Sequence, residues 1–343
     1  MKKLSFFNRL VYYLTVIFSL ALLIACIVPY TDSASLAFFS LAVPILVCVN
    51  ILLVVYWLLQ RKFLMIIPCA VLIYGYMTLG TFLKIKPNDV ITEADIDLKL
   101  MSFNSLGFRG KEDEWESSQG DSIVQFINQE LPDIICFQEF DYRQIRSNNF
   151  DSYSYNYVDF IFGEASGRVL QAIYSKYKII DEGILEFPSS GNSAIYVDII
   201  FKKDTLRVYN VHLESLNIRP GNIKKERSDK LLGRLRKSFE KQQQQSDIVR
   251  AHMASSPYRN IVCGDFNNNQ FSSVYFNLKR DLKDTFMEMG SGYGATIDFW
   301  KFPFRIDFIL VDPSFEVVSH QNYDIDLSDH EPIMTSIKVT SNK

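Results

Sequence analysis

The sequence predicts a layered α/β domain preceded by three transmembrane helices. The first 87 residues contain three long apolar stretches without a charged residue. From about residue 98 onwards, short strand-like runs alternate with helix-like segments, which is typical of an α/β fold. Several of those runs are apolar throughout, as expected for strands that are covered on both faces. We therefore divide the chain into a membrane anchor (1–87), a linker (88–97) and a soluble domain (98–343).

The three apolar stretches are Leu10–Tyr30, Leu36–Gln60 and Phe63–Leu83 (about 10–30, 36–60 and 63–83). About 20 helical residues, at ~1.5 Å each, cross a hydrocarbon core of ~30 Å. Soluble helices rarely stay uncharged over such a length, and here three follow one another. The sequence therefore predicts an integral membrane protein.

The positive charges predict how this anchor is oriented. Basic residues lie before the first stretch and between the second and third: Lys2, Lys3, Arg9, Arg61 and Lys62. The loop between the first two stretches carries only Asp32. Because cytoplasmic loops are enriched in Lys and Arg, three crossings place the soluble domain on the extracytoplasmic side of the inner or plasma membrane. Lys84 and Lys86 argue the other way.

A cleaved signal is the alternative interpretation of the first stretch. A basic start followed by an apolar run is also the signature of a signal peptide, and Leu23-Ile24-Ala25-Cys26 resembles a lipoprotein cleavage site. However, the apolar run continues past Cys26 and no polar tether follows it. Either interpretation leaves the soluble domain outside.

Within the soluble domain, apolar runs predict the strands and one amphipathic stretch predicts a helix at Asp121–Gln129. The predicted strands are Leu98–Phe103, Ile134–Phe137, Ala172–Tyr174, Ala194–Phe201, Leu206–His212, Asn260–Cys263, Phe308–Val311 and Ile333–Val339. Cys136 and Cys263 lie in two of these strands, where we expect buried free thiols, with a disulfide as the alternative if the strands are neighbours.

The charge of the soluble domain narrows its possible partners. Residues 88–343 contain 29 basic and 38 acidic side chains, a net charge of −9. This disfavours a protein that binds nucleic acid through a broad basic surface. Residues 218–241 differ from this acidic composition, because they carry nine basic side chains and three acidic ones. This segment predicts an amphipathic helix with a basic outer face. That face is either solvated or in contact with anionic headgroups or a polyanionic substrate.

Five short polar motifs each follow or precede a predicted strand. They are Ser102-Phe103-Asn104-Ser105, Phe137-Gln138-Glu139, Asn210-Val211-His212-Leu213, Gly264-Asp265-Phe266-Asn267, and the pair Arg305-Ile306-Asp307 and Ser328-Asp329-His330. Each motif alone is also explained by turn chemistry, an ion pair at the surface or a buried histidine. Together they place carboxylates, amides and imidazoles at strand ends, where α/β folds present their sites.

This set of groups suits phosphate-ester hydrolysis with a hard divalent cation. Mg²⁺, or Mn²⁺ in its place, prefers oxygen ligands and needs only one or two carboxylates plus an amide oxygen. A carboxylate can activate the attacking water, and imidazoles can stabilise charge on the phosphoryl oxygens. A second carboxylate can hold a histidine in the protonation state that it needs.

In this order, the motifs resemble the endonuclease/exonuclease/phosphatase family, which includes deoxyribonuclease I-like nucleases, inositol polyphosphate 5-phosphatases and neutral sphingomyelinases. The resemblance spans about residues 97–339, and the GDFN, RID and SDH motifs are highly specific when they occur together. It implies a four-layer α/β sandwich, in which two packed mixed β-sheets are flanked by helices.

The resemblance also implies roles for individual residues. Glu139 would be the principal metal ligand, with Asn104 at the metal and Asp329 close to it. Asp265 would activate the nucleophilic water, and Asp307 would pair with His330 and raise its pKa. The residues expected to contact the substrate phosphate are Asn210, His212, Asn267 and His330.

Two positions depart from patterns of the family. Leu106 stands where relatives that cleave at abasic sites carry an acidic residue, which argues against such repair. Lys178 replaces a proline that many members carry after Ser175-Lys176-Tyr177. Neither change removes a core catalytic group.

The leading hypothesis is a membrane-anchored, metal-dependent hydrolase of phosphate esters, similar to phosphodiesterases and nucleases. A lipid-headgroup phosphodiesterase or phosphatase is an alternative that fits the anchor and the basic segment. A non-catalytic membrane-bound binding protein with a hydrolase fold is the alternative from another class, although the motifs lack none of the expected groups. A transporter or sensor is disfavoured because no charged residue interrupts the three spans. The sequence gives no sign of an obligate protein partner.

Overall fold

The computed structural model describes residues 5–31, 33–84, 96–109, 117–141, 150–159, 169–217, 227–299 and 302–340. Several sequence predictions therefore lie outside the described residues: most of the linker 88–97, the charges of Lys2, Lys3, Asp32 and Lys86, and the first part of the basic segment, 218–226.

The chain forms two compact units, which are described separately. The helical unit comprises residues 1–82 together with 226–243 and 268–277, and the sheet unit comprises the remainder. The sequence did not predict that two segments from the soluble part of the chain would group with the apolar helices.

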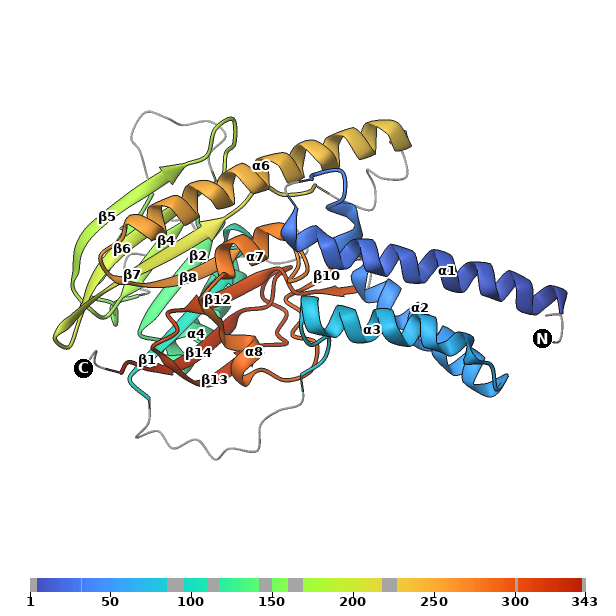
Figure 1. The fold of residues 1–343 in the computed structure, drawn as a ribbon. Coiled ribbons are helices and arrows are strands. Elements are labelled where there is room, and N and C mark those ends of the chain that lie inside the picture. The colour runs from blue at the N-terminus through green and yellow to red at the C-terminus, as the bar shows by residue number, and fades with distance from the viewer. Residues whose placement is uncertain are drawn as a thin grey trace. The chain divides into compact units, whose positions relative to one another are not determined.

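Three apolar helices run side by side in the helical unit (Figure 1). They are α1 (Phe6–Ile27), α2 (Phe38–Leu59) and α3 (Ile66–Leu79). The first two are long and apolar enough to cross a membrane, whereas the third, counted from Phe63, is shorter than the predicted 63–83. It ends before Gly80, whose φ of 84° and ψ of −169° are not helical and are readily adopted only by glycine.

Neutral polar side chains cross-link these helices. The Ser19 hydroxyl of α1 donates to Asn50 Oδ1 of α2 at 2.8 Å, and Asn50 Nδ2 donates to the carbonyls of Phe18 and Leu46. The Trp57 indole donates to the Thr15 hydroxyl at 2.8 Å. These hydrogen bonds satisfy buried polar side chains and join α1 to α2.

The sheet unit contains two mixed six-stranded β-sheets. The first has the order β13-β14-β1-β2-β4-β3 and the second has the order β5-β6-β7-β8-β12-β9. Their strands are β1 (Leu98–Asn104), β2 (Ile134–Gln138), β3 (Tyr155–Val158), β4 (Ala172–Ser175), β5 (Ile179–Glu186), β6 (Ser193–Phe201), β7 (Asp204–His212), β8 (Arg259–Asp265), β9 (Lys283–Asp284), β12 (Asp307–Val311), β13 (Glu316–Asn322) and β14 (Ile333–Lys338). A separate ribbon joins β10 (Ile297–Phe299) to β11 (Phe302–Phe304).

One apolar core lies between the two sheets. It includes Leu100 and Cys136 of the first sheet with Val208 and Cys263 of the second, all fully buried. Both cysteines are free thiols. The apolar faces of adjacent strands therefore pack sheet on sheet, as the unbroken apolar runs predicted.

Helices cover the outer faces of the sheets. On the first sheet, α4 (Ser117–Glu130) packs Ile123 and Ile127 against a second apolar cluster. On the second sheet, the C-terminal half of α6 (Ser228–Ser255) places His252 against the rings of Tyr196 and Tyr209. Two further helices, α7 (Ser273–Lys279) and α8 (Thr285–Met289), are short. The predicted four-layer α/β sandwich is confirmed.

Candidate active site

Strand register brings the polar motifs together at one end of the two sheets. In the first sheet, β1 and β2 are parallel and end together, with Asn104 paired to Gln138. In the second sheet, β7 and β8 are parallel, with His212 paired to Asp265. Strand β12 starts beside them, so that Asp307 pairs with Asp265. Within each sheet, residues far apart in sequence thus become neighbours through backbone pairing.

Gly264 lets the second sheet close tightly at this end. Its φ is +143°, and a Cβ on this residue would lie 2.0 Å from the carbonyl oxygen of Val211. Only glycine fits such an approach between two strands. The glycine of the GDFN motif therefore allows β7 and β8 to present His212 and Asp265 side by side.

Asp265 is the most heavily hydrogen-bonded carboxylate of the site. It is 1% exposed and accepts hydrogen bonds from the backbone N–H of Asn267 at 2.7 Å and from the Asn267 amide at 3.2 Å. The amide of Asn104, from the other sheet, donates to it at 3.1 Å. These donors fix the orientation of the carboxylate.

Glu139 faces the same amide. Asn104 Nδ2 lies 3.4 Å from Glu139 Oε1, so one amide contacts both carboxylates. Glu139 and Asn267 each adopt a φ of +49°, which is unusual for residues other than glycine. Strained backbone of this kind, costing of the order of 1–3 kcal/mol, concentrates at functional sites.

His330 is held by two carboxylates. Its Nδ1 lies 2.9 Å from Asp307 Oδ2, and its Nε2 lies 3.8 Å from Asp265 Oδ2. Two further contacts fix the surroundings. The Thr296 hydroxyl accepts from the backbone N–H of Asp307, and the Ser328 hydroxyl donates to the carbonyl of Asn104 at 2.8 Å.

The two histidines of the cluster have pKa values shifted in opposite directions. Burial by itself lowers the pKa of His330, but the carboxylates of Asp307 and Asp265 raise it to about 10. Burial lowers the pKa of His212. At neutral pH His330 is therefore an imidazolium, whereas His212, with Nε2 3.6 Å from Asp265 Oδ2, is neutral.

Burial and the neighbouring Asp307 raise the pKa of Asp265 to about 8, against the opposing effect of His330. A carboxyl whose pKa lies near neutrality exchanges protons readily under physiological conditions. This is the property that a general base requires.

Two of the expected site residues lie differently from the rest. Asn210 is fully buried, and its amide is used within the protein: it accepts from Gln138 at 2.6 Å and donates to the carbonyls of Phe137 and Ala172. Asp329 is exposed and lies beside Ser328 at the edge of the cluster.

Three residues of the site were not singled out by sequence reasoning. Gln138 joins the two sheets through Asn210, and Thr296 and Ser328 anchor the strands that carry Asp307 and Asn104. Gln138 and Ser328 lie within two of the polar motifs, and this location in the sequence could have identified them as site residues. Thr296 has no local signal, because its partners are the backbone N–H groups of Ile306 and Asp307, ten and eleven residues away.

A divalent cation fits the Glu139 side of this cluster. Glu139 and Asp265 both face the amide of Asn104 there, and carboxylate and amide oxygens are the ligands that Mg²⁺ prefers. Asp265, Asp307 and His330 also bring their ligand atoms within 4.8 Å of one another. However, an imidazolium has no lone pair for a metal, so the raised pKa makes His330 a hydrogen-bond donor.

Three solved structures with similar folds are each less than 20% identical to this chain. Zebrafish (D. rerio) TDP2 complexed with a single-strand DNA product is 16% identical, with 70% of this chain and 98% of that chain covered and a TM-score of 0.55. An endonuclease/exonuclease/phosphatase from Bacteroides vulgatus is 17% identical, with 71% and 99% covered and a TM-score of 0.52. The human nocturnin catalytic domain with bound sulfate is 18% identical, with 73% and 97% covered and a TM-score of 0.52. At this identity the similarity shows the fold.

Sequence comparison assigns the two parts of the chain separately. Residues 8–82 match a domain of unknown function (DUF8431). The sequence matches none of the curated proteins compared with it. Residues 101–330, about two thirds of the chain, match the model of the Endonuclease/Exonuclease/phosphatase family. The resemblance carried by the GDFN, RID and SDH motifs is thereby confirmed: the chain belongs to the endonuclease/exonuclease/phosphatase family of phosphoric ester hydrolases.

Proposed function

We propose that this protein is a membrane-anchored, divalent-metal-dependent enzyme that hydrolyses phosphate esters by direct attack of water. The observation that carries the proposal is the convergence of Asp265, Asp307 and His330 with a second histidine and two candidate metal ligands at one end of the paired sheets. A buried carboxylate with a raised pKa next to an imidazolium is a costly arrangement that a purely structural core does not need.

Each residue then has a distinct task. Asp265 takes a proton from the attacking water, and Asn267, bonded to it, orients the water or the phosphate. His330 donates from Nε2 to a phosphoryl oxygen, because Asp307 holds Nδ1 and keeps the ring protonated. The neutral imidazole of His212 donates a hydrogen bond to the same phosphoryl group. The amide of Asn210, expected from the resemblance to touch phosphate, instead supports the site by joining the sheets through Gln138.

The metal ligands in this proposal are Glu139 and Asn104, with Asp329 near them. Mg²⁺ or Mn²⁺, when bound, supplies positive charge that polarises the phosphoryl oxygens and lowers the pKa of nearby water. Leu106 contributes only its backbone N–H, which donates to Asn104 Oδ1 and steadies that amide.

The test is hydrolysis of a generic phosphodiester by the full-length protein in detergent micelles. Full length is required because residues 226–243 and 268–277 belong to the helical unit. We expect activity with Mg²⁺ or Mn²⁺, loss of activity with EDTA, and recovery when the ion is restored. Activity that EDTA leaves unchanged would contradict the proposed metal dependence.

The substrate class is best resolved by a parallel assay. Plasmid DNA, RNA, sphingomyelin and phosphoinositides represent nucleic acids and phospholipid headgroups. The acidic net charge of residues 88–343 disfavours nonspecific nucleic-acid binding, and the proposed membrane anchor fits the lipid alternative. Cleavage of DNA or RNA alone would favour a nuclease instead.

We also propose that α1, α2 and α3 anchor the chain in a membrane with the catalytic domain on the extracytoplasmic side. The length and apolarity of α1 and α2 support the anchor, and Arg61 and Lys62 between α2 and α3 support a cytoplasmic loop there. Alkaline phosphatase fused after Lys343 should be active in whole cells. An inactive fusion, with an active fusion in the 60–63 loop, would reverse the orientation.

A further inference from the structure

The polypeptide leaves the GDFN motif and enters the core of the helical unit. Asn269, fully buried, donates from Nδ2 to the carbonyl of Ser40 in α2 at 2.9 Å and accepts from the N–H of Phe271 at 3.0 Å. Phe271 is 1% exposed and stacks on the ring of Phe82, with ring centroids 6.2 Å apart. A segment that starts one residue after Asn267 is thus built into the apolar helices.

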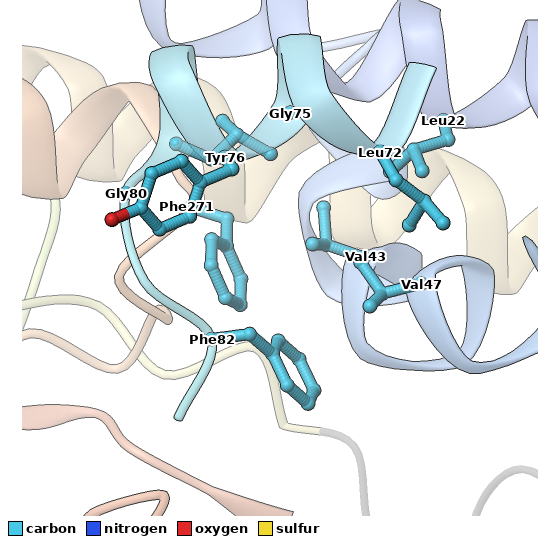
Figure 2. Close-up of a pocket in the computed structure, with 10 residues that line it drawn as sticks. Leu22, Val43, Val47, Leu72, Gly75, Tyr76, Gly80, Phe82 and Phe271 are labelled. Atoms are coloured by element: carbon cyan, nitrogen blue, oxygen red, sulfur yellow. The ribbon is translucent and has the colours of Figure 1, made fainter. Parts of the chain in front are cut away.

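Phe271 forms one wall of a cavity of about 180 Å³ within this unit, called here the α3 pocket (Figure 2). Its other walls come from Leu22, Val43, Val47, Leu72 and Leu79 of the three apolar helices. The hydroxyl of Tyr76 is the one side-chain polar group among the lining residues. Tyr76 is 64% exposed, so the pocket opens beside α3.

The chemistry of the walls selects an apolar occupant. Water in a cavity needs two to four polar partners, and an apolar cavity of about 150 Å³ stays dry and accepts hydrocarbon ligands instead. The pocket is open at the surface of α3, where neighbouring side chains such as Ile73 and Met77 are apolar and 62% and 78% exposed. An occupant therefore enters from an apolar environment.

The depth of the pocket matches one leaflet of a bilayer. Leu22, Val47 and Leu72 lie five, nine and seven residues from the ends of their helices at Ile27, Phe38 and Leu79. At ~1.5 Å per residue these positions are roughly 7–14 Å below the helix ends, and half of a ~30 Å hydrocarbon core is ~15 Å. In that half-layer the abundant hydrocarbon is the acyl chain of a phospholipid.

We propose that the α3 pocket binds one acyl chain of a bilayer phospholipid, which thereby contacts the segment that follows the catalytic motif. The inference rests on the proposed membrane anchor. Phe271 follows Asp265 by six residues, so at most about 20 Å of extended chain joins the lipid contact to the proposed catalytic base.

Photolabelling tests this binding without depending on catalysis. The full-length protein is placed in nanodiscs of phosphatidylethanolamine and phosphatidylglycerol that contain a phosphatidylglycerol with a diazirine in its acyl chain. After irradiation, tryptic peptides are analysed by mass spectrometry. We expect label on the helices and also on Asn260–Lys279, the peptide that contains Phe271.

Two valine variants of α2 make a matched pair. Val47→Phe fills the pocket and should lower labelling of Asn260–Lys279 by about fivefold or more, because a filled cavity does not admit the chain. Val55→Phe, at a position 46% exposed on the same helix, should leave that labelling unchanged. Melting curves of both variants show whether the fold is kept, and the Leu72→Trp variant fills the pocket from α3 if Val47→Phe does not fold.

The outcomes separate the two proposals. Label on the outer faces of α1–α3 but not on Asn260–Lys279, or equal labelling of this peptide in both valine variants, overturns the acyl-chain site and leaves the hydrolase proposal standing. The absence of label from every helix overturns the membrane anchor itself. Pocket labelling in a protein without hydrolase activity would retain the lipid site and reject the proposed function.

Discussion

The helical unit and the catalytic end of the sheet unit both bury polar groups, but they do so in opposite ways. In the helices the buried polar groups are neutral and partnered, as Asn50 is with Ser19 and with two backbone carbonyls. At the catalytic end, carboxylates and imidazoles are crowded together. There, Nδ1 of His212 and Oδ1 of Asp307 have no hydrogen-bond partner among the described residues. The first region is arranged for stability, whereas the second retains charge and open bonding capacity for a substrate.

If this contrast is correct, the largest effect on catalysis comes from Asp265. Asp265→Asn keeps the shape of the side chain but removes the proposed base, and we expect phosphodiester hydrolysis to fall about 10³-fold, in the range of general-base contributions. Initial rates with saturating Mg²⁺ measure this. Asp281→Asn, at an exposed side chain, is the control. A rate within a few fold of wild type would remove Asp265 from the mechanism.

Phe271 tests the helical side of the comparison. Phe271→Ala removes a ring that is buried among the apolar helices, and such truncations cost about 3–5 kcal/mol. We expect a lower melting temperature for the full-length protein in micelles, with Phe271→Leu retaining most of the stability. An unchanged melting temperature for Phe271→Ala would mean that this segment does not hold the helices together.

The negative charge of Asp307 should set part of the pH dependence of the hydrolysis rate. Asp307→Asn removes a carboxylate that raises the pKa of both His330 and Asp265. We expect activity to fall about 10–100-fold, as for other residues that orient a catalytic histidine. His330 then loses its proton at a lower pH than about 10, so the alkaline limb of the pH–rate profile moves to lower pH.

The same substitution predicts a change in stability with a defined sign. A histidine whose folded pKa is raised above its unfolded value stabilises the fold below about pH 6.5, and this contribution is lost as pH rises towards 10. Asp307→Asn should therefore flatten the fall in stability over that interval. Asp312→Asn, just beyond the other end of β12, should change neither profile. An alkaline limb that does not move would break the link between Asp307 and His330.

The smallest effect is expected for the neutral network of the helices. Asn50→Ala removes the bond to Ser19 and should lower stability by roughly 0.6–1.7 kcal/mol, the range of hydrogen bonds between membrane helices. Activity below the melting transition should be unchanged. Cys48→Ala, at an exposed position of the same helix, is the matched control. A selective loss of kcat in Asn50→Ala would show that the two regions are coupled more closely than this contrast allows.

The strands that could be predicted from the sequence are those with two buried faces. Ile134–Gln138 and Arg259–Asp265 read as apolar runs because they lie inside their sheets. The strands that were not predicted, such as Tyr155–Val158, Ile179–Glu186 and Glu316–Asn322, are at sheet edges. Edge strands carry exposed polar side chains and therefore lack the apolar signal.

For the site, the sequence located the groups but not their supports. Asp265 and His330 stand in motifs directly beside strands, so the chemistry of each motif was visible. The partner of Asn210 is Gln138, 72 residues away, and only the packing of two sheets brings them together. Likewise, the amphipathic pattern of residues 218–241 predicted a helix with one buried face, and Leu235 and Phe239 are buried. It did not predict that residues 226–243 group with the apolar helices.

The most direct test of the proposed chemistry is hydrolysis of a phosphodiester by the full-length protein in ¹⁸O-labelled water with Mg²⁺. Attack by an Asp265-activated water at phosphorus places one solvent oxygen in the phosphate product and none in the released alcohol. Asp265→Asn should yield almost no labelled product over the same time. Solvent oxygen in the alcohol, or equal labelling by wild type and Asp265→Asn, would contradict the account.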